Sequence, residues 1–413
     1  MRAGRTTEPV TDSGPKAAPA GGWPRFLAAA YGPPLLSSIG FGAVTPLVVL
    51  SALQLGASVP LSAFITGLTG IAELFGDLPA SWVATRLGEK RAIIAACCWD
   101  TIWLSVAFTA DNLLTLSLAV FCFGLSGSVF GLARQSFITE ATPIRLRARA
   151  LSSLGGTQRI GFFVGPLAGS AIIAAWNLSA AYGFAAVMSL LAAVVTFFLP
   201  DLPADVAARR SSGDAPRLWP VLRTHVRVFA RLGTGVLALQ LIRQARQSIL
   251  PLWCESLGLD PSTTSLVFAV SMGVDMSLFF VGGFIMDRFG RMWVAVPSMI
   301  VLGIGLASLA LAHSTAPVVI VAIVLGLGNG IGAGVVMTLG SDVSPEVGRA
   351  QFLSGWRLMG DTGAMLGPLA ISAITAVASL AMATVALGVL AWLGAAWLGR
   401  GIVKTYTNKA RPD

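Results

Sequence analysis

Residues 318–336, VVIVAIVLGLGNGIGAGVV, form a run of nineteen residues without one charged side chain. Residues 181–199, AYGFAAVMSLLAAVVTFFL, form a second run of the same kind. A helix of about twenty apolar residues is long enough to cross the hydrocarbon core of a bilayer, roughly 30 Å thick. The two runs therefore predict helices that span a membrane.

The composition of the whole chain supports the same interpretation. Of its 413 residues 55% are hydrophobic and only 11% are charged, and the mean hydropathy is +0.78. Soluble domains contain about 25% charged residues. No strand-like alternation recurs along the chain, which argues against a transmembrane barrel. We expect an all-α membrane protein whose surface contacts the lipid bilayer.

Hydropathy, read between charged loops and Gly or Pro breaks, predicts twelve transmembrane helices. The predicted spans are 26–53, 60–83, 92–110, 113–135, 150–174, 181–199, 232–253, 263–285, 293–312, 317–339, 352–376 and 380–399. They divide the chain into a disordered cytoplasmic tail at 1–24, a six-helix bundle at 25–199, a cytoplasmic linker at 200–231, a second six-helix bundle at 232–400 and a cytoplasmic tail at 401–413.

Lys and Arg are distributed very unevenly between the two sides of this topology. With the N-terminus inside, 23 of the 28 basic residues fall in predicted cytoplasmic segments and none falls in the six opposite loops. The positive-inside rule then predicts that both termini are cytoplasmic and that the protein lies in a plasma or inner membrane. The basic residues form no stripe with interleaved aromatic residues, so we expect no nucleic-acid partner despite the net charge of +9.

The two halves of the chain repeat each other at an offset of 202 residues. Residues 143–172 and 345–374 align without a gap and share thirteen of thirty positions. Because each half contains an even number of predicted helices, both repeats have the same orientation in the membrane. This parallel six-plus-six plan is known among transporters, with the substrate site between the halves.

A motif at the end of the eighth predicted span carries a family resemblance. Residues 283–291, GFIMDRFGR, resemble the G-x-x-x-D-R-x-G-R motif of the major facilitator superfamily, and residues 81–90, SWVATRLGEK, form a partial first-half copy with Thr85 in place of Asp. The resemblance implies a conformational latch between helix ends. Its residues here are Arg86, Gly88, Gly283, Asp287, Arg288, Gly290 and Arg291.

A second motif is similar to one found in the twelve-helix drug–proton antiporters of that superfamily. It consists of Gly161, Gly165, Pro166 and Gly169, and the second half repeats it as Gly363, Gly367 and Pro368. The alternative is close helix packing with a proline bend, which small residues four apart also predict. The exporter pattern has an Arg near Val120 and Phe121 that this chain lacks.

Nine charged residues lie deep within predicted spans, where an isolated charge costs about 2.5–3.5 kcal/mol on insertion scales. They are Glu73, Asp77, Asp100, Arg159, Arg243, Arg246, Asp275, Arg357 and Asp361. The offset of 202 superposes Glu73 on Asp275 and Arg159 on Asp361. We expect Glu73, Asp275 and Asp361 to take part in proton-linked switching, with Asp77 and Arg357 in the same charge system. The alternative is a fixed charge network that holds the helices together.

Span seven contains the densest group of polar side chains. Gln240, Arg243 and Gln247 share one helical face, with Gln244 and Arg246 beside it. In the family fold this span lines the central cavity, so we expect these five residues and Arg159 to bind an anionic or polar substrate. The alternative is that both arginines only neutralise Asp275 and Asp361.

These features favour a secondary active transporter that moves a small organic solute by alternating access, as a proton-coupled exporter of drugs or metabolites. An importer or exchanger of organic anions is the first alternative, and a non-transporting membrane receptor is the second. The sequence contains neither a Walker-type loop nor a group of His, Cys or Ser residues at a common depth, so we do not expect an enzyme. We expect a monomer with no metal site and no cofactor.

Overall fold

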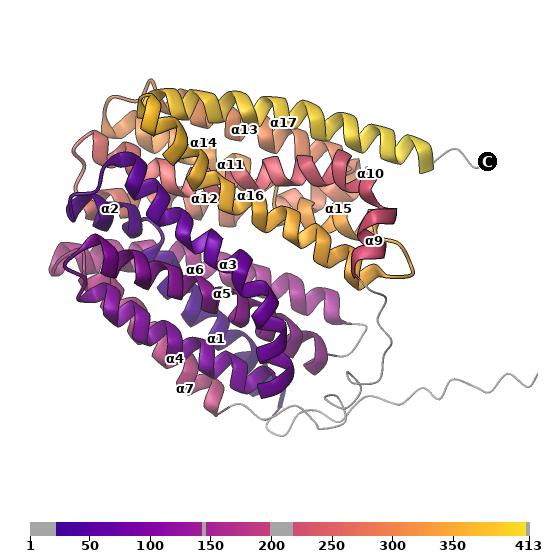
Figure 1. The fold of residues 1–413 in the computed structure, drawn as a ribbon, viewed down its shortest axis with the longest axis horizontal. Helices are drawn as coiled ribbons and strands as arrows, with labels where there is room; N and C mark the ends of the chain where they lie inside the picture. The colour runs from indigo at the N-terminus through magenta and orange to yellow at the C-terminus, as the bar shows by residue number, and fades with distance from the viewer. Residues whose placement is uncertain (1–21, 143–145, 199–217, 410–413) are drawn as a thin grey trace, which may run out of the picture.

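The computed structural model describes residues 22–142, 146–198 and 218–409. The first half consists of α1 (Gly22–Val44), α2 (Leu47–Gln54), α3 (Val59–Leu87), α4 (Glu89–Phe108), α5 (Leu113–Ala141), α6 (Arg147–Ala175) and α7 (Ala180–Phe197). The second half consists of α11 (Thr234–Ser256), α12 (Pro261–Phe289), α13 (Met292–Leu309), α14 (Thr315–Ile331), α15 (Val335–Val343), α16 (Arg349–Val377) and α17 (Leu380–Lys409). Figure 1 shows the two halves as separate helix bundles that lie against each other.

The twelve predicted spans all correspond to helical segments, and two of them are interrupted. Pro46 separates α1 from α2 within the predicted span 26–53, because proline lacks the N–H that a continuous helix needs. Residues 332–334 separate α14 from α15 within the span 317–339, where Gly334 has a φ of +79°. The fold is an all-α membrane protein of twelve spans arranged as two six-span repeats.

The boundaries between the two bundles and the tails differ in detail from the predicted ones. α17 continues without a break to Lys409, nine residues beyond the predicted end of the second bundle at residue 400. Part of the predicted linker is helical, as α9 (Leu218–Thr224), α10 (Val226–Val228) and a π-helical turn (Phe229–Gly233). Residues 1–21 of the predicted N-terminal tail and residues 199–217 of the linker lie outside the described residues.

Side-chain caps mark where several of the long helices begin. Asn112 accepts a hydrogen bond from the backbone N–H of Thr115 at 2.9 Å at the start of α5. Asp260 accepts one from the backbone N–H of Thr263 at 3.0 Å at the start of α12. Such caps satisfy N–H groups that have no partner within the first turn of a helix.

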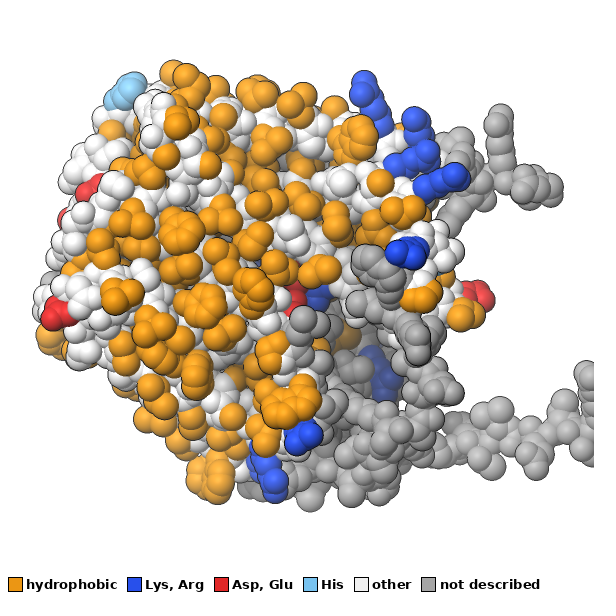
Figure 2. Space-filling view, in the orientation of Figure 1, with side chains coloured by type: hydrophobic (Ala, Val, Ile, Leu, Met, Phe, Trp, Pro, Cys, Tyr) orange, Lys and Arg blue, Asp and Glu red, His pale blue; other side chains and the backbone are white. Residues whose placement is uncertain are grey.

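Ten helical segments of the described residues are long and apolar enough to cross a membrane. The two spans outside this set are α11, which carries Arg243, Arg246 and three glutamines, and α16, which carries Arg357 and Asp361. On the face seen in Figure 2, hydrophobic side chains cover the middle of the molecule, and Lys and Arg gather at the end where α9, α10 and the end of α17 lie. Exposed aromatics such as Phe280 and Trp293 belong to the apolar surface that faces lipid.

The repeat is visible in individual helix contacts. A Cβ added to Gly165 of α6 would lie 2.3 Å from the carbonyl oxygen of Ile39 and 2.7 Å from the nitrogen of Ala43, both in α1. A Cβ added to Gly367 of α16 would lie 2.7 Å from the carbonyl oxygen of Leu241 and 2.7 Å from the nitrogen of Ala245, both in α11. Each residue in the second contact lies 202 positions after its counterpart in the first.

The two halves meet mainly along two helix pairs. α6 of the first half packs against α12 of the second, and α3 of the first half packs against α16 of the second. These pairs are equivalent under the repeat, because α6 corresponds to α16 and α3 corresponds to α12. Each position at one contact therefore has an equivalent position, 202 residues away in sequence, at the other contact.

Candidate functional site

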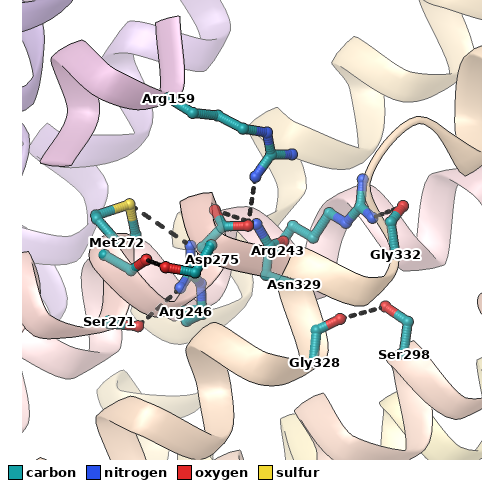
Figure 3. A network of polar contacts seen from close by, with 12 residues as sticks. Arg159, Arg243, Arg246, Ser271, Met272, Asp275, Ser298, Gly328, Asn329 and Gly332 are labelled. Atoms are coloured by element: carbon teal, nitrogen blue, oxygen red, sulfur yellow. Dashed lines mark hydrogen bonds and ion pairs between the residues drawn. The ribbon is translucent and has the colours of Figure 1, made fainter. Parts of the chain in front are cut away.

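The α6–α12 contact contains a charged pair that joins the two halves (Figure 3). The guanidinium Nη1 of Arg159 in α6 donates to Oδ1 of Asp275 in α12. The other carboxylate oxygen, Oδ2, accepts a hydrogen bond of 2.8 Å from the side-chain amide of Asn329 in α14. The Arg159 guanidinium also lies over the ring of Phe279, 4.9 Å from its centroid. Both oxygens of the Asp275 carboxylate are thus engaged.

Two more arginines, both on α11, lie close to this pair. Arg246 is only 2% exposed and donates from Nη1 to the Ser271 hydroxyl at 2.9 Å. Arg243 donates from Nη2 to the carbonyl oxygen of Gly332 at 2.5 Å. Asp275 attracts both guanidinium groups electrostatically, and Arg159 repels both. We call Arg159, Arg243 and Arg246 the arginine cluster.

The α3–α16 contact has more acidic than basic side chains, whereas the α6–α12 contact and its surroundings have more basic than acidic ones. Arg357 of α16 donates from Nη2 to Asp77 of α3 at 3.2 Å and from Nε to Asp361 of α16 at 3.3 Å. Asp361 also lies within hydrogen-bonding reach of Asp77, and its charge acts on Glu73 of α3. We call Glu73, Asp77 and Asp361 the acidic cluster. In the described part of the chain, no three His, Cys, Asp or Glu residues are placed to hold a metal ion.

The repeat relates these two contacts directly. Arg159 and Asp275 form the ion pair at one contact, and the equivalent positions at the other contact are Asp361 and Glu73. The α6–α12 contact therefore pairs an arginine with an acid, whereas the equivalent positions at the α3–α16 contact are both acids. The two contacts differ in net charge although their helices are related by the repeat.

A cavity of about 230 Å³ lies mainly among helices of the first half. Its polar wall includes the carboxyl groups of Glu73 and Asp100, the guanidinium of Arg134 and the side-chain amides of glutamines on α6 and α11. Its apolar wall consists largely of phenylalanines. The lining residues are Ser37, Ser38, Phe41, Glu73, Asp100, Phe123, Gly127, Phe130, Arg134, Gln158, Phe162, Gln244 and Gln247.

Two deep residues of the cavity wall were not part of the predicted site. Asp100 is buried and accepts a hydrogen bond from the Ser126 hydroxyl. Arg134 lies over the ring of Phe130, 5.3 Å from its centroid, and its Nε has no hydrogen-bond partner among the described residues. Position 134 is the second-last residue of the predicted span 113–135. α5 continues to Ala141, so Arg134 lies two turns inside the helix.

The predicted polar face of α11 is divided between two surroundings. Gln244 and Gln247 line the cavity and bond to each other at 3.0 Å. Gln240 accepts a hydrogen bond of 3.2 Å from Nη1 of Arg243, and Arg243 points toward Gly332. Gln240 thus pairs with Arg243, and Gln244 pairs with Gln247 at the cavity. Gly332 leaves room for the Arg243 guanidinium.

Comparison with known proteins assigns the chain to a family. The model described as Major Facilitator Superfamily matches residues 35–244 and 232–413. The chain belongs to the major facilitator superfamily. "Multidrug resistance protein MdtG" of Escherichia coli (strain SMS-3-5 / SECEC) is 26% identical over 178 residues, which cover 42% of this chain and 42% of that protein. The MdtG protein of Salmonella newport (strain SL254) is also 26% identical, with 42% and 43% covered. The similarity thus spans less than half the length of these relatives.

Solved structures share the fold over almost the whole chain. A POT family transporter in complex with 5-aminolevulinic acid superposes with a TM-score of 0.75 at 12% identity and covers 94% of this chain and 97% of its own. A D-xylose–proton symporter superposes with a TM-score of 0.71 at 14% identity and covers 90% and 97%. These superpositions show the fold of the superfamily over both halves of the chain.

The superfamily motif between α12 and α13 forms a compact polar junction. Arg291 donates to Asp342 of α15 through Nε at 2.7 Å and Nη2 at 3.3 Å, and the Tyr406 hydroxyl of α17 donates to the same carboxylate at 2.5 Å. The hydrogen-bonded Asp342 carboxylate raises the pKa of Arg291, because it favours the charged guanidinium. Asp342 was not predicted, since it lies far from the motif in sequence.

The other motif residues lie around this junction. Gly290 has φ +96° and ψ 169°, and Gly88 in the first-half copy has φ +77° and ψ 159°, a region essentially restricted to glycine. Asp287 is close enough to act electrostatically on Arg291. Arg288 and Arg86 lie over aromatic rings, those of Phe289 and Trp82. The close helix approach in this region involves Gly282 rather than Gly283, because only a Cβ at Gly282 would meet the backbone of α14.

The Gly-Pro motifs of α6 and α16 lie at helix contacts. A Cβ on Gly161 would lie 2.4 Å from the Cβ of Ser38, and one on Gly363 would lie 2.2 Å from the carbonyl oxygen of Leu237. Gly169 has only ordinary contacts with Ala43, and Pro166 and Pro368 lie within their helices. Both copies lie at close contacts between equivalent helix pairs.

Proposed function

We propose that this chain is a proton-coupled secondary transporter that exports a small organic solute from the cell. The observation that carries the proposal is the charge difference between the two equivalent contacts of the halves. Three carboxyl groups surround Arg357 at the α3–α16 contact. At the α6–α12 contact Asp275 is held by an arginine and an amide. Both oxygens of the Asp275 carboxylate thus already have partners.

The acidic cluster supports proton binding for an electrostatic reason. If all three carboxyl groups are ionised, one guanidinium neutralises only one of them, and carboxylates crowded in a medium of low dielectric repel one another. The charged groups that act there are Arg357 and Asp361 from α16 and Asp77 from α3 itself, and Arg357 in turn acts on Arg134 of α5. A proton shared within the cluster removes part of this repulsion.

Protonation at this contact would change how strongly the halves attract each other. Arg357 bonds to Asp77 across the contact and to Asp361 on its own helix. A proton on Asp77 weakens the attraction between α3 and α16, whereas a proton on Asp361 releases Arg357 from its partner on the same helix. Proton binding therefore biases the equilibrium between closed and open arrangements of α3 and α16. Alternating access needs such a two-state contact. Glu73 belongs both to this cluster and to the cavity wall, which links the proton site to bound solute.

Export is the direction favoured by the relatives, which are named multidrug resistance proteins. The cavity wall of phenylalanines with a few polar groups suits a small amphipathic molecule. We infer that the solute binds between the phenylalanines and the glutamines Gln244 and Gln247. The fold neighbours include a sugar–proton symporter, so the fold itself leaves direction open to experiment.

Everted membrane vesicles provide the test. Compounds are first selected by the growth protection that the chain gives to a susceptible strain. Their accumulation is then measured in vesicles whose interior is more acidic than the outside. We expect accumulation that collapses when the gradient is dissipated. Glu73→Gln should abolish the dependence on the gradient, whereas Glu255→Gln, at the exposed end of α11, should leave it intact. Accumulation that is equal with and without a gradient in the parent chain would exclude proton coupling.

A second candidate function, exchange of organic anions, is favoured by the arginine cluster. Three guanidinium groups beside one carboxylate suit carboxylate or phosphate groups. The same vesicles distinguish the two functions. Counterflow of one anion against another, unaffected by dissipating the pH gradient, would support exchange over proton-driven export.

A further inference from the structure

The arginine cluster has more positive charge than its surroundings neutralise. Arg159, Arg243 and Arg246 share the single carboxylate of Asp275, so two positive charges remain. The other partners of these arginines are neutral: the Ser271 hydroxyl, the Gly332 carbonyl and the Gln240 amide. Figure 3 shows Asp275 between Arg159 and Arg246, with Arg243 directed toward Gly332.

Buried donors of this cluster also lack partners. Nε of Arg246, in a residue that is 2% exposed, has no hydrogen-bond partner among the described residues, and neither has Nε of Arg243. A guanidinium carries five N–H donors in a fixed plane. Arg159 uses one donor on Asp275 and is 21% exposed. The cluster therefore contains unused donors as well as excess charge.

The two charged contacts differ in how they can be neutralised. A carboxyl group that is crowded by other carboxyl groups can take up a proton. A guanidinium keeps its charge at any physiological pH. Excess positive charge in a membrane interior is therefore balanced only by a negative group that comes from outside the cluster.

The cluster lies beside the cavity rather than far from it. Gln158 lines the cavity and directly precedes Arg159 on α6, and Gln244 and Gln247 line it and directly follow Arg243 and Arg246 on α11. The same two helices thus present amides to the cavity and guanidinium groups to the adjoining region. Arg159 and Arg243 are not among the lining residues, so a molecule bound in the cavity would reach them by extending one group past the glutamines.

We infer that the arginine cluster binds the anionic group of the transported solute, which is a carboxylate, phosphonate or phosphate on an apolar or aromatic body. This inference rests on the proposed transport function and names its substrate class. The phenylalanines of the cavity hold the body, and Arg159 and Arg243 hold the anion. Because Arg159 also bonds to Asp275 across the two halves, an anion that competes for this guanidinium couples solute binding to the α6–α12 contact.

A charge series of nearly equal size tests the inference. The purified full chain, in nanodiscs of zwitterionic phosphatidylcholine at constant ionic strength, is titrated with benzoate, benzamide and benzylammonium, and its thermal unfolding is recorded. We expect a saturable rise in the unfolding temperature with benzoate only. In Arg243→Gln we expect the apparent Kd for benzoate to rise about tenfold or more, corresponding to the loss of roughly 1.4 kcal/mol. Arg349→Gln, whose side chain is exposed, serves as the control.

The outcomes separate this inference from the proposed function. A saturable shift with benzylammonium but not with benzoate overturns the anion site, and so does the absence of any benzoate shift. An equal benzoate shift in parent and Arg243→Gln also overturns it. If Arg243→Gln does not fold, Arg243→Lys keeps the charge but loses the planar fork, and weaker binding of benzoate there is the expected result. Proton-driven accumulation in vesicles is measured independently and survives all of these failures.

Discussion

At the residue scale, Asp275 determines the charge balance of the second half. Its two oxygens bond to Arg159 and Asn329, and its charge acts on Arg243 and Arg246 as well. Asp275 therefore has a structural role in keeping three guanidinium groups in the membrane interior, even while an anionic solute is absent.

The first prediction concerns the removal of this carboxylate. Asp275→Asn keeps the shape of the side chain but leaves the arginine cluster without its counter-charge. Breaking a buried charge pair in this way costs about 3–5 kcal/mol. We expect a large fall in the unfolding temperature of the purified protein in detergent. Asp77→Asn is the matched control and should cost clearly less, because its side chain is 25% exposed and other carboxyl groups remain near Arg357. Equal losses in both variants would contradict this account.

At the scale of helices, glycine positions rather than motif names explain the packing. Gly165 and Gly367 occupy equivalent contacts, and the glycines of α5 and α14 do the same: Gly124 packs on Thr69, and Gly326 packs on Ser271. Each second-half residue lies 202 positions after its first-half counterpart. The Gly-Pro sequences are thus part of a wider set of close helix contacts that both halves keep.

The second prediction compares two glycines that have opposite surroundings. Gly363→Ala puts a methyl group 2.2 Å from the backbone oxygen of Leu237, so α16 must move away from α11. Overpacking of this kind costs about 1–3 kcal/mol. Gly283→Ala adds a methyl group where no atom lies within 4 Å and should have little effect. Thermal unfolding of the two variants is the measurement. A Gly283→Ala variant as unstable as Gly363→Ala would contradict this account.

The third prediction concerns the N-cap of α12. The backbone N–H and the hydroxyl of Thr263 donate to the Asp260 carboxylate at 3.0 and 2.6 Å, and these hydrogen bonds lower its pKa. A lowered pKa means that the stabilisation is present above the unfolded value of about 3.9 and is lost as the pH falls through the folded value. We expect Asp260→Ala to cost about 0.5–2 kcal/mol at pH 7. The difference from the parent chain should shrink below about pH 4, as thermal unfolding at several pH values would show. A difference that does not depend on pH would contradict this assignment.

The sequence predicted the helices, the repeat and the charged positions for identifiable reasons. Hydropathy between charged loops and Gly or Pro breaks gives the spans, including those of α11 and α16, although these two helices are too polar to be selected by apolar length alone. The one-sided distribution of Lys and Arg gives the orientation. The partners of the charges were beyond sequence reasoning. Arg291 with Asp342 and Arg357 with Asp77 lie 51 and 280 positions apart, and only the fold brings them together. The partner of Arg243 was also beyond prediction, because its guanidinium bonds to Gly332 and fits only where that residue has no side chain. Helical periodicity does not reveal such a contact.

At the scale of the whole molecule, the halves also touch where α6 ends and α12 begins. The hydroxyl groups of Ser170 and Ser262 lie 2.9 Å apart, and the Ser265 hydroxyl donates to the carbonyl oxygen of Pro166 at 2.9 Å. This end of the α6–α12 contact is uncharged, whereas Arg159 and Asp275 form an ion pair farther along it. A rocking motion of the halves must break the serine contact in one of its two arrangements.

The fourth prediction uses this serine contact to test the rocking motion. In the double variant Ser170→Cys with Ser262→Cys, we expect oxidation to form a disulfide, since the two side chains already meet. The cross-link should stop solute accumulation in vesicles, and reduction should restore it. The single variant Ser170→Cys is the control and should keep transport under the same oxidant, which excludes effects on the native cysteines. Full transport by a chain that is completely cross-linked would show that the halves do not separate at this end, and alternating access would then have to proceed through the α3–α16 contact alone.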